Sequence, residues 1–215
     1  MTRLAPSVRW TIAAGVVLFA LIAALAFELY DGDRPGSGAR VLSDREHRAT
    51  DTSAALTTLR HRADLPPCPV AGGDQTTLAS ALNGVVVECA ADGAPVDVAR
   101  ALAGRRVVLD LWAYWCTPCM AELPAMAEYQ RRMGPSVLVV TVHQDENEAA
   151  ALARMSELGV RLPTLQDGRR LIGAALRVPN VMPATVVLRP DGSVAQTLPR
   201  DFSTADEIVA AVGPQ

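Results

Sequence analysis

Residues 107–119 read Val-Val-Leu-Asp-Leu-Trp-Ala-Tyr-Trp-Cys-Thr-Pro-Cys, a strand-forming segment that leads to two cysteines. Its first six residues are apolar apart from Asp110, and the residues after Cys119 are mostly helix formers, so the cysteines stand where a strand leads into a helix. Unpaired N–H groups and the positive end of the helix dipole favour a thiolate there, and such sites lower a cysteine pKa from about 8.5 to roughly 3.5–7.5. The segment predicts a redox-active dithiol in which Cys116 is the nucleophile and Cys119 the resolving thiol.

The chain has 215 residues, of which 50% are hydrophobic, and its net charge is −3. This length accommodates one domain with an ordinary core and some additional segments, but not two full domains. The slight negative charge gives no electrostatic reason to expect nucleic acid as a partner. All 20 basic residues are arginine, and the chain has no lysine.

An uncharged segment, residues 10–27, lies near the N-terminus. At 1.5 Å per residue a helix over this segment would measure about 27 Å, close to the roughly 30 Å of hydrocarbon in a bilayer. The arginines before it predict that residues 1–9 are cytoplasmic. We therefore expect a single-pass anchor at 10–27 in a cell membrane, with the C-terminal domain extracytoplasmic. A signal peptide cleaved at the Ala-Leu-Ala of residues 24–26 is the alternative.

Residues 28–67 are expected to form an extracytoplasmic linker, and 68–215 the folded domain. Residues 31–40 are rich in Gly, Pro and charge and lack the apolar surface that packing requires. The polar segment 43–64 contains Leu56 and Leu59 at helical spacing, which leaves a solvated helix open as an alternative.

Residues 110–119 resemble the active-site segment of the thioredoxin-like superfamily. The resemblance rests on Trp-Cys-x-Pro-Cys, the Trp-Ala pair at 112–113, the acid six residues before the first cysteine and the proline five residues after the second. The Glu-Leu-Pro of residues 122–124 is similar to the membrane-anchored extracytoplasmic branch for thiol-disulfide interchange, which includes the thioredoxin-like proteins of cytochrome c maturation. The resemblance covers roughly residues 85–212, and it implies an α/β thioredoxin fold, with a mixed central sheet flanked by helices.

The resemblance also implies where a client protein binds. Pro183 is expected to be cis and to pack against the dithiol, so that the backbone of Met182 pairs with an extended client segment. A trans proline at the start of a strand is the alternative. Trp115 is expected at an apolar rim that clients touch, although packing against the core is the alternative role of this side chain.

Two acids are expected to assist the dithiol. Asp110 lies inside an apolar strand, and burial without a nearby cation should raise its pKa. Thioredoxins carry a lysine on the neighbouring strand, whereas the aligned residue here is Thr141. Glu122 is expected to help set the cysteine pKa; the alternative is that it only stabilises an early helical turn. His143 resembles no catalytic residue of the family and is expected to be a loop histidine.

Four cysteines allow three pairings. Proximity and the motif pair Cys116 with Cys119, which leaves Cys68 to pair with Cys89 as a structural disulfide. In an exported chain two disulfides are the usual outcome. A second redox pair is the alternative role for Cys68 and Cys89, and a zinc site is disfavoured because they are not closely spaced.

The rest of the domain alternates between strand and helix signals. A mixed sheet with helices on both faces is the architecture that this alternation favours. Strands are expected at 85–88, 107–112, 137–142, 185–188 and 194–198, and helices at 96–102, 119–132, 146–158, 169–176 and 204–212.

The combined features predict a membrane-tethered thiol-disulfide oxidoreductase. Its expected partners are exported protein thiols or disulfides, a membrane redox partner and the membrane itself; no cofactor and no metal are implied. A reductase is favoured, with apocytochrome c as a candidate client. The alternatives are an oxidase that forms disulfides with the same residues, and a thioredoxin-fold binding module without turnover.

Overall fold

The computed structural model describes residues 53–70 and 80–212. The cytoplasmic segment expected at 1–9, the anchor expected at 10–27 and the first part of the expected linker lie outside the described residues. Among the helices within the described ranges, none has both the length and the apolar character that crossing a membrane requires.

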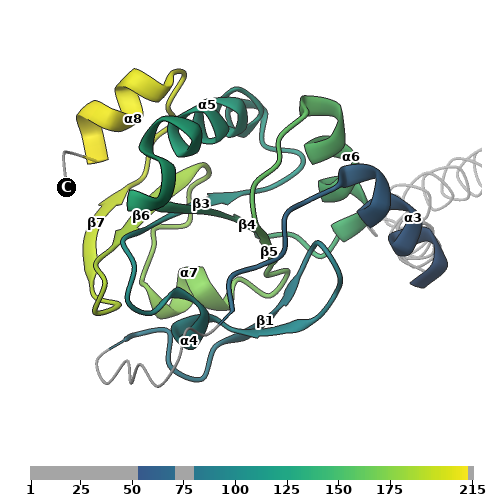
Figure 1. The fold of residues 1–215 in the computed structure, drawn as a ribbon, viewed down its shortest axis with the longest axis horizontal. Coiled ribbons are helices and arrows are strands. Elements are labelled where there is room, and N and C mark those ends of the chain that lie inside the picture. Colours follow the sequence, from purple (N-terminus) through teal and green to yellow (C-terminus); the bar gives the residue numbers. More distant parts are fainter. Residues whose placement is uncertain (1–52, 71–79, 213–215) are drawn as a thin grey trace, which may run out of the picture. The chain divides into compact units, whose positions relative to one another are not determined.

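A mixed sheet lies at the centre of the described residues, with the strand order β2-β1-β5-β4-β3-β6-β7 (Figure 1). Strands β3, β4 and β5 run parallel to one another, whereas β1 and β6 are antiparallel to their neighbours. The strands are β1 (Val86–Cys89), β2 (Pro95–Asp97), β3 (Val107–Trp112), β4 (Leu138–His143), β5 (Thr164–Gln166), β6 (Ala184–Leu188) and β7 (Val194–Leu198).

Strand β3 is central because it can bury both of its faces. All six of its residues are buried, and alternate side chains enter two different hydrophobic cores. Val108 and Trp112 belong to one core, while Leu109 and Leu111 belong to the other. Asp110 therefore points to the same face as Trp112.

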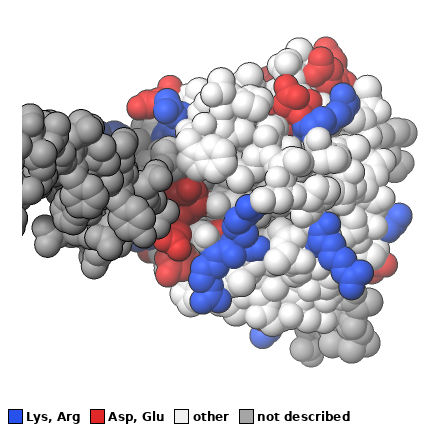
Figure 2. Space-filling view, turned by 180° about the vertical axis from the view of Figure 1, so that it is seen from behind, with Lys and Arg blue, Asp and Glu red and all other residues white. Residues whose placement is uncertain are grey.

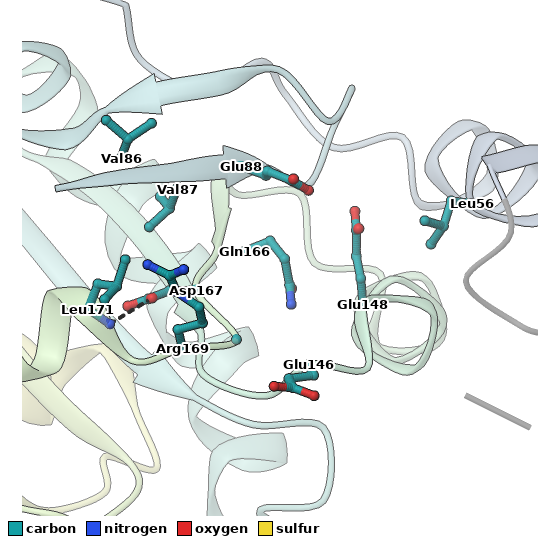
Figure 3. Close-up of a pocket in the computed structure, with 11 residues that line it drawn as sticks. Leu56, Val86, Val87, Glu88, Glu146, Glu148, Gln166, Asp167, Arg169 and Leu171 are labelled. Atoms are coloured by element: carbon teal, nitrogen blue, oxygen red, sulfur yellow. Dashed lines mark hydrogen bonds between the residues drawn. The ribbon is translucent and has the colours of Figure 1, made fainter. Parts of the chain in front are cut away.

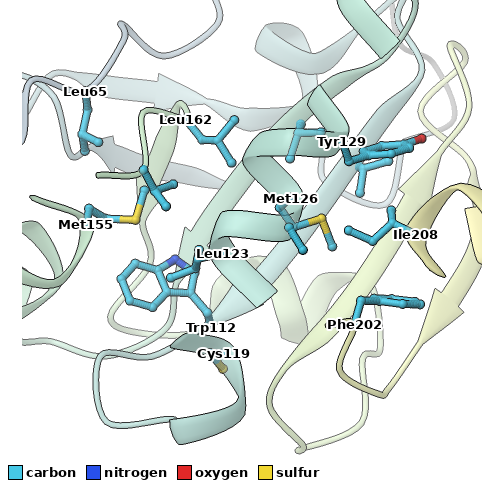
Figure 4. Packing of buried hydrophobic residues seen from close by; sticks show 14 of the residues in the cluster. Leu65, Trp112, Cys119, Leu123, Met126, Tyr129, Met155, Leu162, Phe202 and Ile208 are labelled. Carbon is cyan, nitrogen blue, oxygen red and sulfur yellow. The ribbon is translucent and has the colours of Figure 1, made fainter. Parts of the chain in front are cut away.

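Helices cover both faces of the sheet (Figure 1). Helices α5, α6 and α8 lie over the face of Trp112, and α4 and α7 lie over the opposite face. Figure 4 shows the first core, in which Trp112, Leu123, Met126 and Ile208 lie together. The helices are α3 (Ser53–Ala63), α4 (Val98–Leu102), α5 (Thr117–Met133), α6 (Glu148–Leu158), α7 (Leu171–Ala175) and α8 (Ala205–Val212), with a 3-10 turn at Gly134–Ser136.

The expected mixed sheet flanked by helices is confirmed, and two strands are added to it. Strands β2 and β5 have three residues each and were not predicted; the helix expected at 96–102 begins only at Val98, because Val96 and Asp97 belong to β2. Such short segments have no room for an alternating pattern, and they are strands because neighbouring strands supply their hydrogen-bond partners.

Helix α3 lies within the segment 28–67 that the sequence assigned to a linker, and it packs against α6. Arg60 donates from Nε and Nη2 to Oε1 of Glu148 over 3.2 Å and 2.9 Å, and Ala63 is fully buried. The guanidinium of Arg60 also lies against Gly93, where an added Cβ would come within 2.8 Å of Nη1. Gly93 has a φ of +79°, a conformation that favours glycine, and a Cβ there would also require the Arg60 guanidinium to shift. The packed domain therefore includes α3, which precedes the start that the sequence predicted at Cys68.

Candidate active site

The dithiol stands at the N-terminus of α5. Cys116 is the N-cap residue, and its Sγ accepts a hydrogen bond from the Cys119 N–H over 3.3 Å. The two cysteines are bonded to each other, with their Cα atoms 5.3 Å apart. Pro118 fits in the first turn because it has no N–H to leave unpaired there. Local sequence thus places both sulfurs at the positive end of a helix of 17 residues.

The two sulfurs differ in their access to solvent. Cys116 is 5% exposed, whereas Cys119, in the first turn of α5, is completely buried in the first core (Figure 4). A disulfide or thiolate from another protein can therefore reach Cys116 more readily than Cys119. This geometry matches a nucleophile and a resolving thiol.

Pro183 lies next to this end of β3. The Met182–Pro183 peptide bond is cis, the form that the resemblance implied. Ala184 pairs with Leu111 in the antiparallel register of β6 with β3, which places Pro183 near the end of β3 that leads to the dithiol. Met182 is half-buried and Val181 is 45% exposed, so apolar surface continues outward along this segment.

Asp110 and Glu122 meet on the face of the sheet that α5 covers. Thr185 pairs with Asp110 across β6 and β3, and its Oγ1 donates to Oε1 of Glu122 over 3.4 Å. Both acids are buried. Both oxygens of Asp110, and Oε2 of Glu122, have no hydrogen-bond partner among residues 53–70 and 80–212.

Burial perturbs both carboxyl groups strongly. Loss of solvent raises the pKa of Asp110 to about 7. Loss of solvent, and then the nearby Asp110, raise the pKa of Glu122 to about 9, with opposing contributions from the Thr185 hydroxyl and Arg200. The sequence could predict the burial of Asp110, but not that Glu122 would share its surroundings.

Thr141 occupies the position across β4 from Asp110. Its Oγ1 forms a 2.8 Å hydrogen bond with Oγ1 of Thr164 on β5, which turns this hydroxyl toward β5. A neutral hydroxyl therefore stands at the position for which the resemblance to thioredoxins implied a lysine. No cation on this strand offsets the cost of ionising Asp110.

Trp115 lies at the rim of the dithiol. Its side chain is 56% exposed, and its Nε1–H donates to Oδ2 of Asp145 over 2.9 Å. Asp145 follows β4, so the carboxyl end of that strand orients the indole. Of the two roles considered for Trp115, its position agrees with the exposed rim.

His143 is a site residue that the sequence analysis missed. It was expected in a loop, but it is the last residue of β4 and is fully buried. Its Nε2 accepts a hydrogen bond from the Tyr114 N–H over 3.4 Å, and its ring lies 4.9 Å from that of Trp112 between centroids. No local signal marked it, because the register that pairs His143 with Trp112 is a property of the folded sheet.

The second disulfide joins Cys68 and Cys89, the pairing that the sequence predicted, with Cα atoms 5.8 Å apart. These two residues belong to the core on the opposite face of the sheet from Cys116 and Cys119. The sheet therefore separates the two disulfides, which weighs against a direct exchange of electrons between them.

A pocket of about 420 Å³ opens beside the ends of β1 and β5 (Figure 3). Its lining is acidic, with Glu88, Glu146, Glu148 and Asp167, and none of the four cysteines lines it. Asp167 is engaged in accepting hydrogen bonds from the N–H groups of Leu171 and Ile172 at the start of α7. Within the described ranges no group of three or more His, Cys, Asp or Glu residues is arranged to hold a metal ion.

Comparison with known proteins finds sequence relatives. A sequence model of the Redoxin family matches residues 74–212. Thiol-disulfide oxidoreductase ResA of Bacillus subtilis is 33% identical over 98 residues, which are 45% of this chain and 54% of that protein. Thioredoxin 1 of Synechococcus elongatus is 39% identical over 69 residues, which are 30% of this chain and 61% of that protein. The chain thus spans about half the length of the ResA relative.

Solved structures share the same fold. A secreted disulfide oxidoreductase of Mycobacterium tuberculosis, described as homologous to E. coli DsbE, has a TM-score of 0.53 and 27% identity. The match covers 61% of this chain and 96% of that one. DsbF of the same organism has a TM-score of 0.55 and 24% identity, over 62% of this chain and 96% of its own.

Proposed function

Because this chain belongs to the Redoxin family of thioredoxin-like proteins, we propose that it is a thiol-disulfide oxidoreductase that acts on exported proteins. One observation carries the proposal: a bonded Cys-x-x-Cys pair at the N-terminus of α5, in which Cys116 retains 5% exposure and Cys119 is fully buried. A binding module without turnover would not need this asymmetry between Cys116 and Cys119.

The exchange proceeds in two steps when the dithiol is reduced. The Cys116 thiolate attacks one sulfur of a client disulfide, the client S–S bond breaks, and the other client sulfur leaves as a thiolate that takes up a proton. The Cys119 thiol then loses its proton and attacks Sγ of Cys116. The Cys116–Cys119 disulfide forms, and the second client thiol is released. Two electrons pass from the dithiol to the client, and the reverse sequence oxidises a client dithiol.

Asp110 is the group suited to receive the proton of Cys119. A pKa of about 7 lets this carboxyl take up and release a proton near neutral pH. Glu122 holds its proton to higher pH and supplies a neutral neighbour to Asp110 while it does so. We assign to Glu122 the role of adjusting the pKa of Asp110 and of the cysteines, because Glu122 and Asp110 are buried next to each other.

Client binding is assigned to the surface beside the dithiol. The cis Met182–Pro183 segment and the exposed indole of Trp115 supply, respectively, backbone groups and apolar surface for an extended client segment. This mode of binding depends on backbone hydrogen bonds, which suits an enzyme with many clients.

We place the enzyme outside the cytoplasm, tethered by residues 10–27, and favour the role of a reductase. The uncharged sequence of 10–27 and the Cys68–Cys89 disulfide support an exported domain. A reductase on that side of the membrane requires electrons from a membrane redox partner. Apocytochrome c, which must keep its cysteines reduced for haem attachment, is the proposed client.

Trapping of clients tests the exchange chemistry. In a Cys119→Ser variant the resolving step is lost, so mixed disulfides with clients should accumulate through Cys116 and be visible by non-reducing electrophoresis. Cys116→Ser is the matched control and should trap none. Equal trapping by both variants would show that the assignment of roles is wrong.

Two further measurements test the direction of electron transfer and the location of the enzyme. Thiol trapping in intact cells should find Cys116 and Cys119 mostly reduced; a mostly oxidised pair would indicate an oxidase instead.

Carbonate washing should leave the full-length chain with the membranes. A shortened chain that begins near Phe27 in the exported soluble fraction would contradict the anchor.

A further inference from the structure

A buried histidine lies beneath the loop that carries the dithiol. The loop consists of residues 113–115 between the end of β3 and the helix cap at Cys116. The ring of His143 is fully buried, with its centroid 4.9 Å from that of Trp112 and 6.1 Å from that of Tyr114. The family mechanism described above makes no use of this ring.

The hydrogen bonds of His143 determine which of its nitrogens carries the proton. The Tyr114 N–H can only donate, so Nε2 of His143 must accept and carries no hydrogen. Nδ1 therefore carries the proton and donates to Oε1 of Gln166 over 2.9 Å. Burial lowers the pKa of His143, against smaller opposing effects of Gln166 and Asp145, so the ring is neutral as this arrangement requires.

Gln166 is held in the orientation that this bond needs. Its Nε2–H donates to the backbone oxygen of Asp145 over 2.7 Å, which leaves Oε1 to accept from His143. The same Asp145 accepts from the indole of Trp115. In Figure 3, Gln166 projects from β5 toward the side of the pocket that holds Glu146.

Two arms thus connect the ends of β4 and β5 to the loop before the dithiol. One arm runs from Gln166 through His143 to the backbone of Tyr114, and the other runs from Gln166 through Asp145 to the side chain of Trp115. The loop is only three residues long, and the Cys116 N–H closes it by donating to the Ala113 oxygen over 3.0 Å. A displacement of Tyr114 must therefore move the cap at Cys116.

We propose that His143 and Gln166 are positioning residues that hold the dithiol loop and so set the reactivity of Cys116. The inference rests on the proposed exchange function, which it deepens. Neither residue touches a reacting sulfur; both act through the backbone at Tyr114. The neutral ring is essential, because a proton on Nε2 would face the Tyr114 N–H donor to donor.

Two substitutions at position 143 separate the two hydrogen bonds of the first arm. Asn places its amide near the position of Nδ1, and Gln places its amide near that of Nε2. His143→Gln can thus still accept from the Tyr114 N–H, whereas His143→Asn cannot. His61→Asn, on the exposed face of α3, is the matched control.

The measurement is the rate of Cys116 alkylation by iodoacetamide as a function of pH, on the reduced full-length chain in detergent. His143→Asn should shift the thiol pKa upward and lower kcat/KM for a protein disulfide about fivefold, as expected for one lost hydrogen bond. His143→Gln and His61→Asn should stay within about twofold of the wild type. Gln166→Met, at a half-buried position, removes the bonds to both His143 and the Asp145 oxygen and should shift the profile in the same direction, even if the histidine variants fold poorly.

The alkylation profile requires no client, so it reports on the loop even if the proposed function fails. An absence of disulfide exchange by the wild type, combined with a shifted profile in His143→Asn, would overturn the function and support the positioning role. Unchanged profiles in His143→Asn and Gln166→Met, with only a lower free energy of unfolding, would overturn the positioning role.

Discussion

The indole N–H of Trp115 donates to Oδ2 of Asp145 over 2.9 Å, although the side chain of Trp115 is 56% exposed. An exposed aromatic ring would otherwise sample several rotamers. Asp145 also accepts from the Asn147 N–H through Oδ1, so its own carboxylate is oriented by the start of α6. The apolar rim beside Cys116 is thereby held in one position before a client arrives, which lowers the entropy lost on binding.

Removal of the hydrogen bond between Trp115 and Asp145 should weaken client binding more than it slows disulfide exchange. We expect Asp145→Ala to raise KM for a protein disulfide several-fold, while kcat with a small disulfide stays nearly unchanged, since the lost hydrogen bond contributes about 1 kcal/mol. Asp145→Asn retains an acceptor oxygen and is the control. Steady-state kinetics with both substrates would provide the comparison, and a fall in kcat alone would contradict a role in binding.

The buried acids predict a stability that decreases as pH rises. From their ordinary values of 3.8 and 4.5, the pKa values of Asp110 and Glu122 are raised to about 7 and about 9 in the folded protein. Between each pair of values the folded state binds more protons than the unfolded state, so the free energy of unfolding falls with rising pH. The slope is at most about 1.4 kcal/mol per pH unit for each acid.

Urea denaturation of the oxidised protein at pH 5 and pH 8 measures this dependence. Asp110→Asn should flatten the decrease up to about pH 7, and Glu122→Gln should flatten it over the whole interval, up to about pH 9. Asp206→Asn, at a highly exposed acid, is the control variant. A wild type that gains stability between pH 5 and pH 8 would contradict the assignment of raised pKa values.

The Cys68–Cys89 disulfide is expected to be structural. Its cysteines are 21 residues apart, and on the chain-entropy model a bridge of that size stabilises by about 3 kcal/mol. The double variant Cys68→Ala/Cys89→Ala should lose that much free energy of unfolding and retain most of its kcat/KM. Loss of turnover in a variant that remains folded at the assay temperature would instead favour a redox role for the second pair.

The ion pair between Arg60 and Glu148 should anchor α3. Its side chains are only 17% and 7% exposed, so Arg60→Met would leave a buried carboxylate without this partner and should cost about 1–3 kcal/mol of unfolding free energy. Arg154→Met breaks the exposed pair with Glu157, for which at most about 1 kcal/mol is expected. Equal losses in the two variants would show that α3 contributes little to the stability of the domain.

Much of the fold could be predicted because each element carries its own signal. Strand β3 was expected with its observed bounds, 107–112, and α5 begins only two residues before its expected start. The difference at α5 arises because Cys116 caps the helix and Pro118 is tolerated in the first turn. The short strands β2 and β5 were missed, since three residues are too few for periodicity to show.

The sequence by itself determined the dithiol at a strand-to-helix junction and the succession of the longer elements. These features are local, and propensity, spacing and capping encode them within a few residues. Only the tertiary structure decided the surroundings of the site. Glu122 meets Thr185 across 63 residues of chain, and His143 meets the Tyr114 backbone across 29. Such contacts depend on the register between strands and on the packing of α5 over the sheet, because residues remote in sequence carry no local signal of their partners.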